Sequence, residues 1–320
     1  MSESSRIYLE NSDERMSKIE QSFTAKSFPD SVLVETTAHC NLNCIQCANS
    51  SLLRPKGFME MSLFKKIVDE VAEENPEASF WFAFYGEPLI VKYKLFYMIR
   101  YAKEHGLKNT YVNTNAMLLN KDMAEMLIDS GLDHLIVGLD GCSSNTHDNI
   151  RRGAKYEVVK DNIIRLNNIR KKRGIGPRIE AQFIVMEENE HELEQYKKLW
   201  AEQQVAVKIR RRNTWAGRVG DDSYISNHLS RVACGWTIGI CPITWDGKVV
   251  ACGTDCDAAY PFGNVKEQSI KEIWNADKQG FIRKHLEHRF DELPELCRNC
   301  KDWQVLGHVD YDEDGNEITK

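Results

Sequence analysis

The stretch SVLVETTAHCNLNCIQC, residues 31–47, joins a short apolar run to three closely spaced cysteines. The run at 31–37 is rich in β-branched residues, which predicts a strand. It leads directly into Cys40, Cys44 and Cys47, which are separated by three and then two residues. Clustered cysteines in a reducing compartment indicate metal binding or catalysis. The stretch therefore predicts a strand that ends in a metal-binding loop.

Five more segments with strand character follow, each reached through a segment with helical periodicity. The predicted strands are 31–37, 78–89, 109–115, 133–141, 178–186 and 205–210, and the predicted helices are 61–75, 93–106, 121–131, 156–174 and 190–203. This alternation predicts parallel βαβ units with right-handed crossovers. Six units are fewer than the eight of a closed barrel, so we predict an α/β fold with an open, partial (β/α)6 barrel like part of a TIM barrel.

Polar motifs stand at the ends of four successive predicted strands. The cysteine loop follows the first strand, and the others are YGEP (85–88), NTNA (113–116) and LDGC (139–142). In barrels of this kind the working residues lie at the C-terminal ends of the strands. We therefore expect these four motifs to form one site.

The composition excludes several classes of protein. The 48 acidic residues exceed the 42 basic ones, for a net charge of −6, which argues against nucleic-acid binding. No apolar run approaches the ~20 residues that span a bilayer, so we expect no membrane partner. The polar, acidic N-terminus is not a secretory signal, which predicts a cytoplasmic protein with reduced cysteines.

The alternation of strands and helices stops near residue 213. Residues 230–303 hold six of the ten cysteines and few regular elements, so we predict a small cysteine-rich domain held together by metal. The predicted organisation is a mobile N-terminal lead-in (1–30), the barrel (31–212), a linker (213–229), the cysteine-rich domain (230–303) and an acidic tail (304–320).

Three thiolates are one short of a complete set for a four-iron cluster. Cys40, Cys44 and Cys47 can ligate three irons and leave the fourth open to an external ligand, just as catalytic zinc keeps an open position. The alternative is a structural zinc loop, which needs a fourth ligand. His39 is adjacent but sterically awkward for that role.

A Cys-x3-Cys-x2-Cys loop after the first strand of a βα barrel resembles the radical S-adenosylmethionine (SAM) superfamily. The resemblance implies a 4Fe–4S cluster on Cys40, Cys44 and Cys47, whose open iron is chelated by SAM. It also implies reductive cleavage of SAM to a 5′-deoxyadenosyl radical that abstracts a hydrogen atom from the substrate. A reductant protein such as flavodoxin or ferredoxin is the implied electron donor.

Three further motifs extend this resemblance. YGEP is similar to the Gly-Gly-Glu-Pro strand end of the family, which implies that Gly86 and Glu87 receive the amino group of SAM. NTNA is similar to a Thr-Asn-Gly segment and places Asn115 at the cofactor. The stretch LDGCSSNTHDNIRRG (139–153) resembles a segment whose arginine binds the cofactor carboxylate, and Arg151 suits that role because a planar fork matches a carboxylate.

The chain also departs from the family pattern at three positions. Tyr85 replaces the first glycine of Gly-Gly-Glu-Pro, Ala116 stands where glycine is usual, and Gln46 stands where an aromatic residue commonly shields adenine. The departure at Gln46 puts a stacking contact with adenine in question.

The C-terminal cysteines resemble a SPASM domain or its shorter relative, twitch. The resemblance implies one auxiliary 4Fe–4S cluster, fully ligated by Cys234, Cys252, Cys297 and Cys300. Two alternatives stay open. Cys241 can replace Cys234, or a structural zinc can occupy Cys252, Cys256, Cys297 and Cys300.

Other candidate residues each have two interpretations. Cys142 is either a catalytic hydrogen-atom donor or a compact core residue. Four residues past the last strand are candidates either for substrate binding or for bridging to the cysteine-rich domain: Arg210, Arg212, Asn213 and Trp215.

The favoured function is oxidation of a secondary alcohol of a sugar or aminocyclitol, with the auxiliary cluster accepting an electron. Tyr85, His147 and Glu180 are placed near strand ends or on a strand, but no general base is assigned among them. The alternatives are an epimerase with Cys142 or Cys241 as hydrogen donor, a peptide-modifying enzyme, and a zinc-binding interaction protein without activity.

Overall fold

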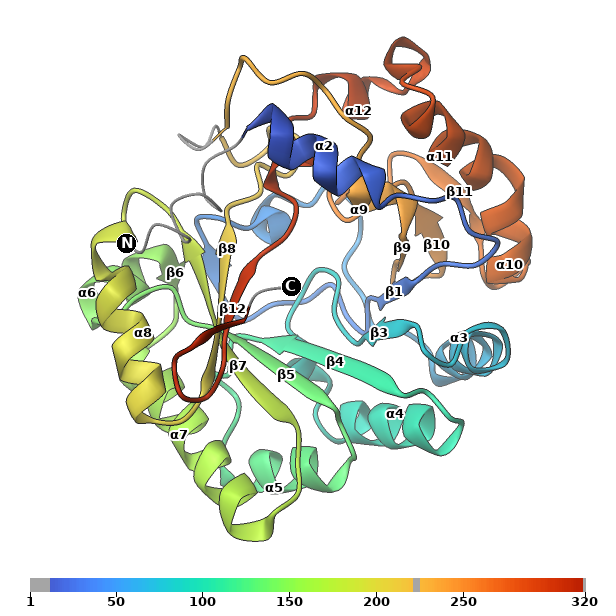
Figure 1. Cartoon of the computed structure of the whole chain (residues 1–320). Helices are drawn as coiled ribbons and strands as arrows, with labels where there is room; N and C mark the ends of the chain where they lie inside the picture. The colour runs from blue at the N-terminus through green and yellow to red at the C-terminus, as the bar shows by residue number, and fades with distance from the viewer. Residues whose placement is uncertain (1–11, 221–224, 319–320) are drawn as a thin grey trace.

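The computed structural model describes residues 12–220 and 225–318 and confirms the partial barrel. The six predicted strands form the centre of one sheet in the order β1-β3-β4-β5-β7-β8, and every neighbouring pair is parallel. These strands are β1 (Ser31–Val34), β3 (Ser79–Trp81), β4 (Asn109–Thr114), β5 (His134–Gly138), β7 (Arg178–Val185) and β8 (Ala206–Arg211). Their curvature is visible in Figure 1.

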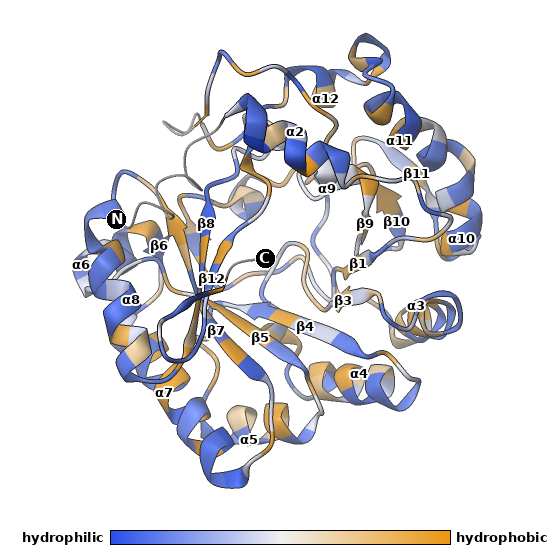
Figure 2. Ribbon diagram, in the orientation of Figure 1, coloured by the Kyte–Doolittle hydropathy of each residue, from blue (hydrophilic) through white to orange (hydrophobic). Residues whose placement is uncertain are grey.

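The crossover helices cover the outer face of the sheet (Figure 1). They are α3 (Met61–Glu74), α4 (Tyr93–Glu104), α5 (Lys121–Asp129), α7 (Tyr156–Arg173) and α8 (Leu193–Glu202). In α3, Leu63, Ile67 and Val71 recur every four residues and are buried, which makes one apolar stripe. Figure 2 shows the same division elsewhere, with apolar residues on the strands and hydrophilic residues on the outer helix surfaces. Within the described ranges, no helix combines the length and apolarity needed to cross a bilayer.

The sheet continues beyond the six strands at both edges, which the sequence did not predict. β9 (Ile240–Ile243) pairs in parallel with β1, and β10 (Lys248–Val250) and β11 (Pro261–Asn264) follow in antiparallel order. At the other edge, β12 (Val309–Tyr311) pairs antiparallel with β8, and β13 (Glu317–Ile318) pairs with β12. The cysteine-rich region and the acidic tail therefore both contribute strands to the sheet of the barrel.

The lead-in contains a helix where the sequence suggested mobility. Helix α2 (Asp13–Gln21) begins at Ser12, whose side chain accepts a hydrogen bond from the Arg15 amide. Its Met16 is fully buried with Val232 and Trp303, so it packs against the C-terminal part of the chain. The sequence analysis did not predict this helix, because the periodicity of one short helix with a single buried residue is too weak to find. Residues 1–11 lie outside the described part of the chain.

The remaining elements are short and cluster around the cysteine segments. Near the barrel mouth these are β2 (Asn43–Cys44), α6 (Ser144–Ile150) and β6 (Arg151–Arg152), and in the cysteine-rich region they are α9 (Gly235–Ile238), α10 (Ile270–Ile273), η4 (Trp274–Lys278), α11 (Gln279–Leu286) and α12 (Glu295–Asn299). Further short helical turns are η1 (Ala48–Ser51), η2 (Pro88–Val91), η3 (Glu190–Glu192), η5 (Phe290–Glu292) and η6 (Asp302–Val305).

Candidate functional site

The three-cysteine loop leaves the C-terminal end of β1 and is fixed by two local contacts. Cys44 lies in β2, opposite Arg151 in β6. The sulfur of Cys47 accepts a hydrogen bond from the Asn49 amide at 3.4 Å. Burial raises the pKa of Cys40 to about 11 and that of Cys44 to about 12. These thiols therefore hold their protons until a metal displaces them.

The YGEP segment lies directly against the cysteine loop. The Glu87 amide donates a hydrogen bond to the carbonyl of His39 at 2.8 Å. Gly86 has a φ of +87°, and a Cβ atom there would lie 2.2 Å from the Thr37 carbonyl oxygen. Only glycine allows both this backbone conformation and this approach. The second glycine of the family pattern is thus required by the geometry of the loop.

The Glu87 side chain joins the ends of β3 and β4. Its carboxylate accepts hydrogen bonds from the Leu89 amide (3.0 Å), the Thr114 hydroxyl (2.6 Å) and the Asn115 amide (2.7 Å). Burial raises the pKa of Glu87, and the bonds from Asn115 and Thr114 act against this rise. The Asn115 side-chain amide in turn donates to Asn41, beside Cys40, at 2.9 Å. Predicted cofactor residues from two strand ends therefore meet at the cysteine loop.

Arg151 is held on the opposite side of the loop by a buried carboxylate. Its Nε donates to Asp140 at 2.7 Å, and Gln46 donates to the same oxygen atom at 2.6 Å. The guanidinium lies against Gly138, where a Cβ atom would come within 2.2 Å of Nη2. Burial alone would lower the pKa of Arg151, but Asp140 and Cys44 raise it, so the guanidinium stays charged. The buried Oε1 of Gln46 has no hydrogen-bond partner among the described residues.

These observations test whether the loop fits an iron–sulfur cluster with an external ligand. The loop supplies three sulfur donors, an oriented guanidinium suited to a carboxylate, and an unpaired acceptor at Gln46 suited to an N–H donor. The residues present therefore fit a cluster together with a small molecule that carries a carboxylate and donor groups.

The second cysteine set surrounds a cavity in the C-terminal region, which we call the auxiliary cavity. It is lined by Cys234, Cys252, Cys297 and Cys300, together with the aromatic residues Trp236, His285 and Trp303, the charged residues Arg231 and Asp302, and Thr237, Thr254 and Leu296. The Cys252 sulfur lies 3.1 Å from the Thr254 hydroxyl, and the Cys300 sulfur accepts from the Asp302 amide at 3.3 Å. Four sulfurs around one enclosed space suit a cluster ligated entirely by protein.

Neither alternative ligand lines the auxiliary cavity. Cys241 is fully buried in β9 and belongs to the main hydrophobic core. Cys256 packs instead beside Tyr85 and Ala48. In the described ranges, no three histidine, cysteine or acidic side chains are arranged around a single metal ion. The auxiliary cavity therefore favours Cys234, Cys252, Cys297 and Cys300 as the ligand set.

Three contacts connect the two cysteine sets. The Tyr85 hydroxyl donates to the carbonyl of Gly253, beside Cys252, at 3.1 Å. Trp215 packs against Tyr85 with 5.2 Å between ring centroids, and its indole N–H donates to the carbonyl of Gln46 at 2.7 Å. Burial raises the pKa of Tyr85 well above its usual value, with further contributions from Cys256 and Cys47. The tyrosine that replaces the family glycine therefore lies between the two sets.

Arg54 adds a buried ion pair to this connection. Its terminal nitrogens donate to both oxygens of Glu35, at 2.8 and 2.5 Å, while its Nε donates to the carbonyl of Cys256 at 2.6 Å. The Glu35 side chain is fully buried, and its second oxygen also accepts from the Trp245 amide at 3.0 Å. The sequence had given no signal for this pair, because Glu35 is a lone acid within an apolar run.

Cys142 lies apart from both sets. Its sulfur contacts the carbonyl of Glu192 at 3.7 Å, and its amide donates to the Glu192 carboxylate, which also accepts from Ser143 and Thr146 at the start of α6. This environment favours the interpretation of Cys142 as a packing residue, and its catalytic role stays a prediction.

Residues at the end of β8 and just beyond it contact the cysteine-rich region and the linker. The Arg210 guanidinium lies 5.5 Å from the centroid of the Trp236 ring, and Arg212 donates to the carbonyl of Val219 at 2.6 Å. Together with Trp215, they favour a bridging role over substrate binding.

Of the three residues considered as a general base, two are buried and hydrogen-bonded, and the third lies away from the cysteine loop. Tyr85 is held by Gly253, and His147 is fully buried with its Nδ1 3.2 Å from the Asp140 amide. Burial lowers the pKa of His147 to about 3. Glu180 is the third residue of β7, toward the strand end opposite the cysteine loop.

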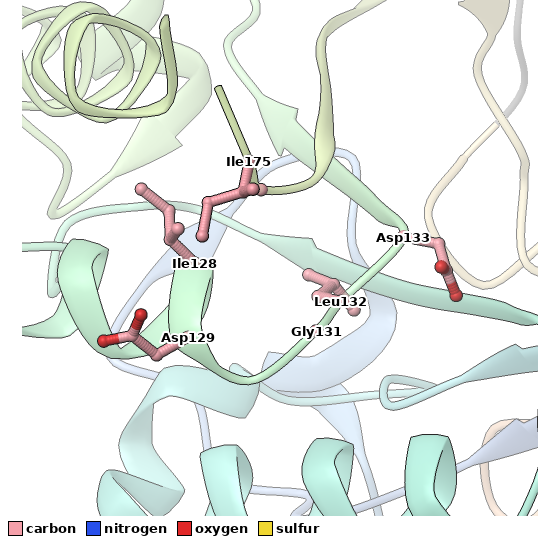
Figure 3. A pocket seen from close by; sticks show the side chains of 7 residues that line it. Ile128, Asp129, Gly131, Leu132, Asp133 and Ile175 are labelled. Carbon is pink, nitrogen blue, oxygen red and sulfur yellow. The ribbon is translucent and has the colours of Figure 1, made fainter. Parts of the chain in front are cut away.

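A surface hollow at that opposite end carries no comparable chemistry. It lies between the end of α5 and the segment before β7, and Figure 3 shows Asp129 and Asp133 on different sides of it. Asp133 is already held by Lys103 at 2.7 Å and by the Thr110 hydroxyl at 2.6 Å. The polar groups that line the hollow therefore do not converge on a ligand.

Comparison with protein families gives two matches. Residues 34–199 match the family described as the radical SAM superfamily, and residues 234–301 match the family described as an iron–sulfur cluster-binding domain, SPASM. The first range contains the three-cysteine loop, and the second contains all the cysteines of the auxiliary cavity.

Two curated relatives cover most of the chain. An AdoMet-dependent heme synthase from Methanosarcina barkeri is 26% identical over 339 residues, covering 89% of this chain and 95% of the relative. An S-adenosyl-L-methionine-dependent 2-deoxy-scyllo-inosamine dehydrogenase from Niallia circulans is 22% identical over 282 residues, covering 87% and 95%.

Two solved structures share the fold. The structure of BtrN in complex with AdoMet and 2-DOIA has a TM-score of 0.62 at 22% identity and covers 87% of this chain and 94% of that one. Streptococcus suis SuiB bound to the precursor peptide SuiA has a TM-score of 0.66 at 13% identity, covering 91% and 74%.

Proposed function

The chain belongs to the radical SAM superfamily, and on that premise we propose that it oxidises a secondary alcohol of a sugar or aminocyclitol. Its cofactors are SAM and 4Fe–4S clusters, and its C-terminal SPASM domain carries the auxiliary cluster site. When bound, these groups supply a 5′-deoxyadenosyl radical that removes the carbinol hydrogen atom and, at the auxiliary site, an acceptor for the second electron.

The observation that carries the proposal is the auxiliary cavity. All four of its cysteines come from this chain, so a cluster held there has no open iron for a substrate, which suits it to electron transfer. The relative that is named as a 2-deoxy-scyllo-inosamine dehydrogenase aligns over 87% of the chain and supports an aminocyclitol as substrate. Oxidation of a secondary alcohol to a ketone removes two electrons and two protons. One electron and one proton leave as the hydrogen atom, the hydroxyl proton leaves to a base or to solvent, and the second electron needs such an acceptor.

The chain's own residues position the reactants. We assign Cys40, Cys44 and Cys47 to the first cluster, and Cys234, Cys252, Cys297 and Cys300 to the auxiliary one. Arg151, held by Asp140, is assigned to the SAM carboxylate. Gly86, Glu87 and Asn115 are assigned to its amino end, where they shape the strand ends beside the loop. The contacts of Tyr85, Trp215 and Arg54 hold the segment 253–256, which follows Cys252, close to the first site.

The test is anaerobic reconstitution with iron, sulfide, reductant and SAM, followed by incubation with 2-deoxy-scyllo-inosamine and related aminocyclitols. We expect 5′-deoxyadenosine and a ketone in equal amounts, and deuterium at the carbinol carbon should be transferred to 5′-deoxyadenosine. Deuterium entering the substrate carbon from heavy water would instead identify an epimerase. Turnover of peptides but of no aminocyclitol would also refute the proposal.

A further inference from the structure

A lysine is completely buried behind the wall of the auxiliary cavity. Lys278, the last residue of η4, is fully buried, and its ammonium group donates to the Thr237 hydroxyl at 2.7 Å and to the carbonyl of Ala251. Thr237 lines the cavity, and Ala251 immediately precedes the cysteine ligand candidate Cys252. Lys278 therefore hydrogen-bonds to one residue that lines the cavity and to another that adjoins a candidate ligand.

The rest of the surroundings of Lys278 are aromatic. The ammonium nitrogen lies 5.3 Å from the ring centroid of Phe262, 5.4 Å from that of Phe281 and 5.7 Å from that of Trp274. Ring faces stabilise a cation but do not neutralise it. In the described part of the chain, no carboxylate is paired with Lys278. The ionisable groups that interact with it include four cysteines, Cys252, Cys241, Cys297 and Cys234, and also His285.

An unneutralised buried charge is costly, so this position needs an explanation. An isolated ammonium in a low-dielectric interior is strongly unfavourable unless an opposite charge compensates for it. Three of the four cysteines around Lys278 line the auxiliary cavity. The metal-free protein offers Lys278 no paired carboxylate among the described residues, whereas a cluster held by four thiolates is anionic and becomes more so when it gains an electron.

We propose that Lys278 is a built-in counter-charge of the auxiliary site and raises the electron affinity of the cluster held there. This inference deepens the proposed function, since it gives the auxiliary site a reason to accept an electron, and it rests on the assignment of that site. It also predicts an asymmetry: the lysine destabilises the metal-free protein and stabilises the cluster-loaded one. A residue that only fills space and ties two loops together would stabilise both forms.

The experiment measures the auxiliary cluster alone. In full-length protein carrying Ala at Cys40, Cys44 and Cys47, the auxiliary cluster is reconstituted and its midpoint potential is read by electron paramagnetic resonance during a redox titration. We expect Lys278→Met to lower its electron affinity at least tenfold, which is about 59 mV for a one-electron couple. Lys278→Arg should restore most of the difference, because it keeps the charge.

Lys284→Met is the matched control. Lys284 lies in α11, six residues along the chain, and its side chain is 35% exposed and paired with Glu292 at 3.6 Å. Removing this surface charge should leave the potential unchanged, because solvent screens it. Thermal unfolding of each variant with and without iron gives the second readout. Lys278→Met should unfold at the same or a higher temperature than its parent without iron, and at a lower temperature with the cluster.

Each outcome decides the proposal. An unchanged potential in Lys278→Met, or an equal loss in the Met and Arg variants, assigns Lys278 to packing and overturns it. The same holds if Lys278→Met destabilises the metal-free and loaded forms alike, or if neither variant takes up iron. Iron uptake by the Arg variant but not by the Met variant supports it. A shifted potential with no oxidation of any aminocyclitol would uphold Lys278 and refute only the proposed substrate.

Discussion

The two cysteine sets are built in different ways. The first comes from eight consecutive residues, 40–47, and is surrounded by charged and polar groups: Glu87, Asp140, Arg151 and the unpaired oxygen of Gln46. The second gathers Cys234, Cys252, Cys297 and Cys300 from a span of 67 residues, around an enclosed cavity that aromatic residues line together with Arg231 and Asp302, with the buried Lys278 behind it. A site that receives a polar molecule needs oriented polar groups, whereas a site that exchanges only electrons needs enclosure and the right charge. The difference in surroundings thus matches the difference in proposed role.

Replacing cysteines of either set should have the largest effect of the changes proposed. Replacing Cys40, Cys44 and Cys47 together with Ala should abolish 5′-deoxyadenosine formation and halve the iron content from ~8 to ~4 per chain. Cys297→Ala should also lower the iron content, but it should retain SAM cleavage while losing ketone formation. Iron and sulfide analysis with product quantification checks both variants. Equal loss of SAM cleavage in the two would show that the sets do not have separate roles.

Breaking the Arg54–Glu35 ion pair should have the next largest effect, because this pair also hydrogen-bonds to Cys256 and Trp245 of the cysteine-rich region. Arg54→Met leaves the Glu35 carboxylate buried and unpaired, so we expect a loss of about 3–5 kcal/mol in the free energy of unfolding, measured in urea. Lys26→Met is the control, because the Lys26–Asp30 pair is about half exposed and its loss should cost less than about 1 kcal/mol. Equal losses in the two variants would contradict the role given to Arg54.

A substitution at Gly86 should affect the first cysteine set alone and so separate it from the second. The Cβ atom of Gly86→Ala would collide with the Thr37 carbonyl, so we expect a loss of about 2–3 kcal/mol and weaker iron binding at the first site only. Gly106→Ala is the control, since Gly106 has a similar φ of +99° but nothing within 4 Å of its added Cβ. Selective iron loss in Gly86→Ala, by analysis and spectroscopy, checks the prediction. Iron loss in both variants would mean that backbone strain, not the close contact, matters.

The smallest effect concerns Glu192, which belongs to neither set. Burial alone would raise the pKa of Glu192, but hydrogen bonds from Cys142, Thr146 and Ser143 lower it overall. A carboxylate with a lowered folded-state pKa stabilises the protein above its unfolded value of 4.5, and this stabilisation is lost as the pH falls through the folded-state pKa. Glu192→Gln should therefore cost about 1 kcal/mol at pH 7 and progressively less below pH 4.5, as unfolding at several pH values would show. A cost that does not vary with pH would contradict this account.

The barrel and most residues near the site could be predicted because their signals are local. Alternation of β-branched strands with amphipathic helices such as α3 depends only on neighbouring residues. Cys40, Cys44 and Cys47 can be recognised from their spacing in the sequence. The grouping of Cys234 with Cys252, Cys297 and Cys300 came from a resemblance rather than from spacing, and the cavity now favours it over Cys241.

What sequence reasoning missed depends on contacts between distant segments. β9 and β12 are three or four residues long, and β9 contains Pro242, so neither has a strong strand pattern of its own. Lys278 sits among charged and polar residues in the sequence, where a lysine normally indicates a solvent-exposed position. Only the packed structure shows that its ammonium group is enclosed.

The pairing of β9 with β1 has a consequence for how the protein is made. Ser31 to Val34 leave the ribosome more than two hundred residues before their partner, Ile240 to Ile243, so one border of the nascent barrel has unpaired backbone groups during most of synthesis. Such an open border can pair with other chains, which makes aggregation of incomplete polypeptides a hazard of production. Expression that is slow and cool, or that supplies chaperones, addresses this interval directly.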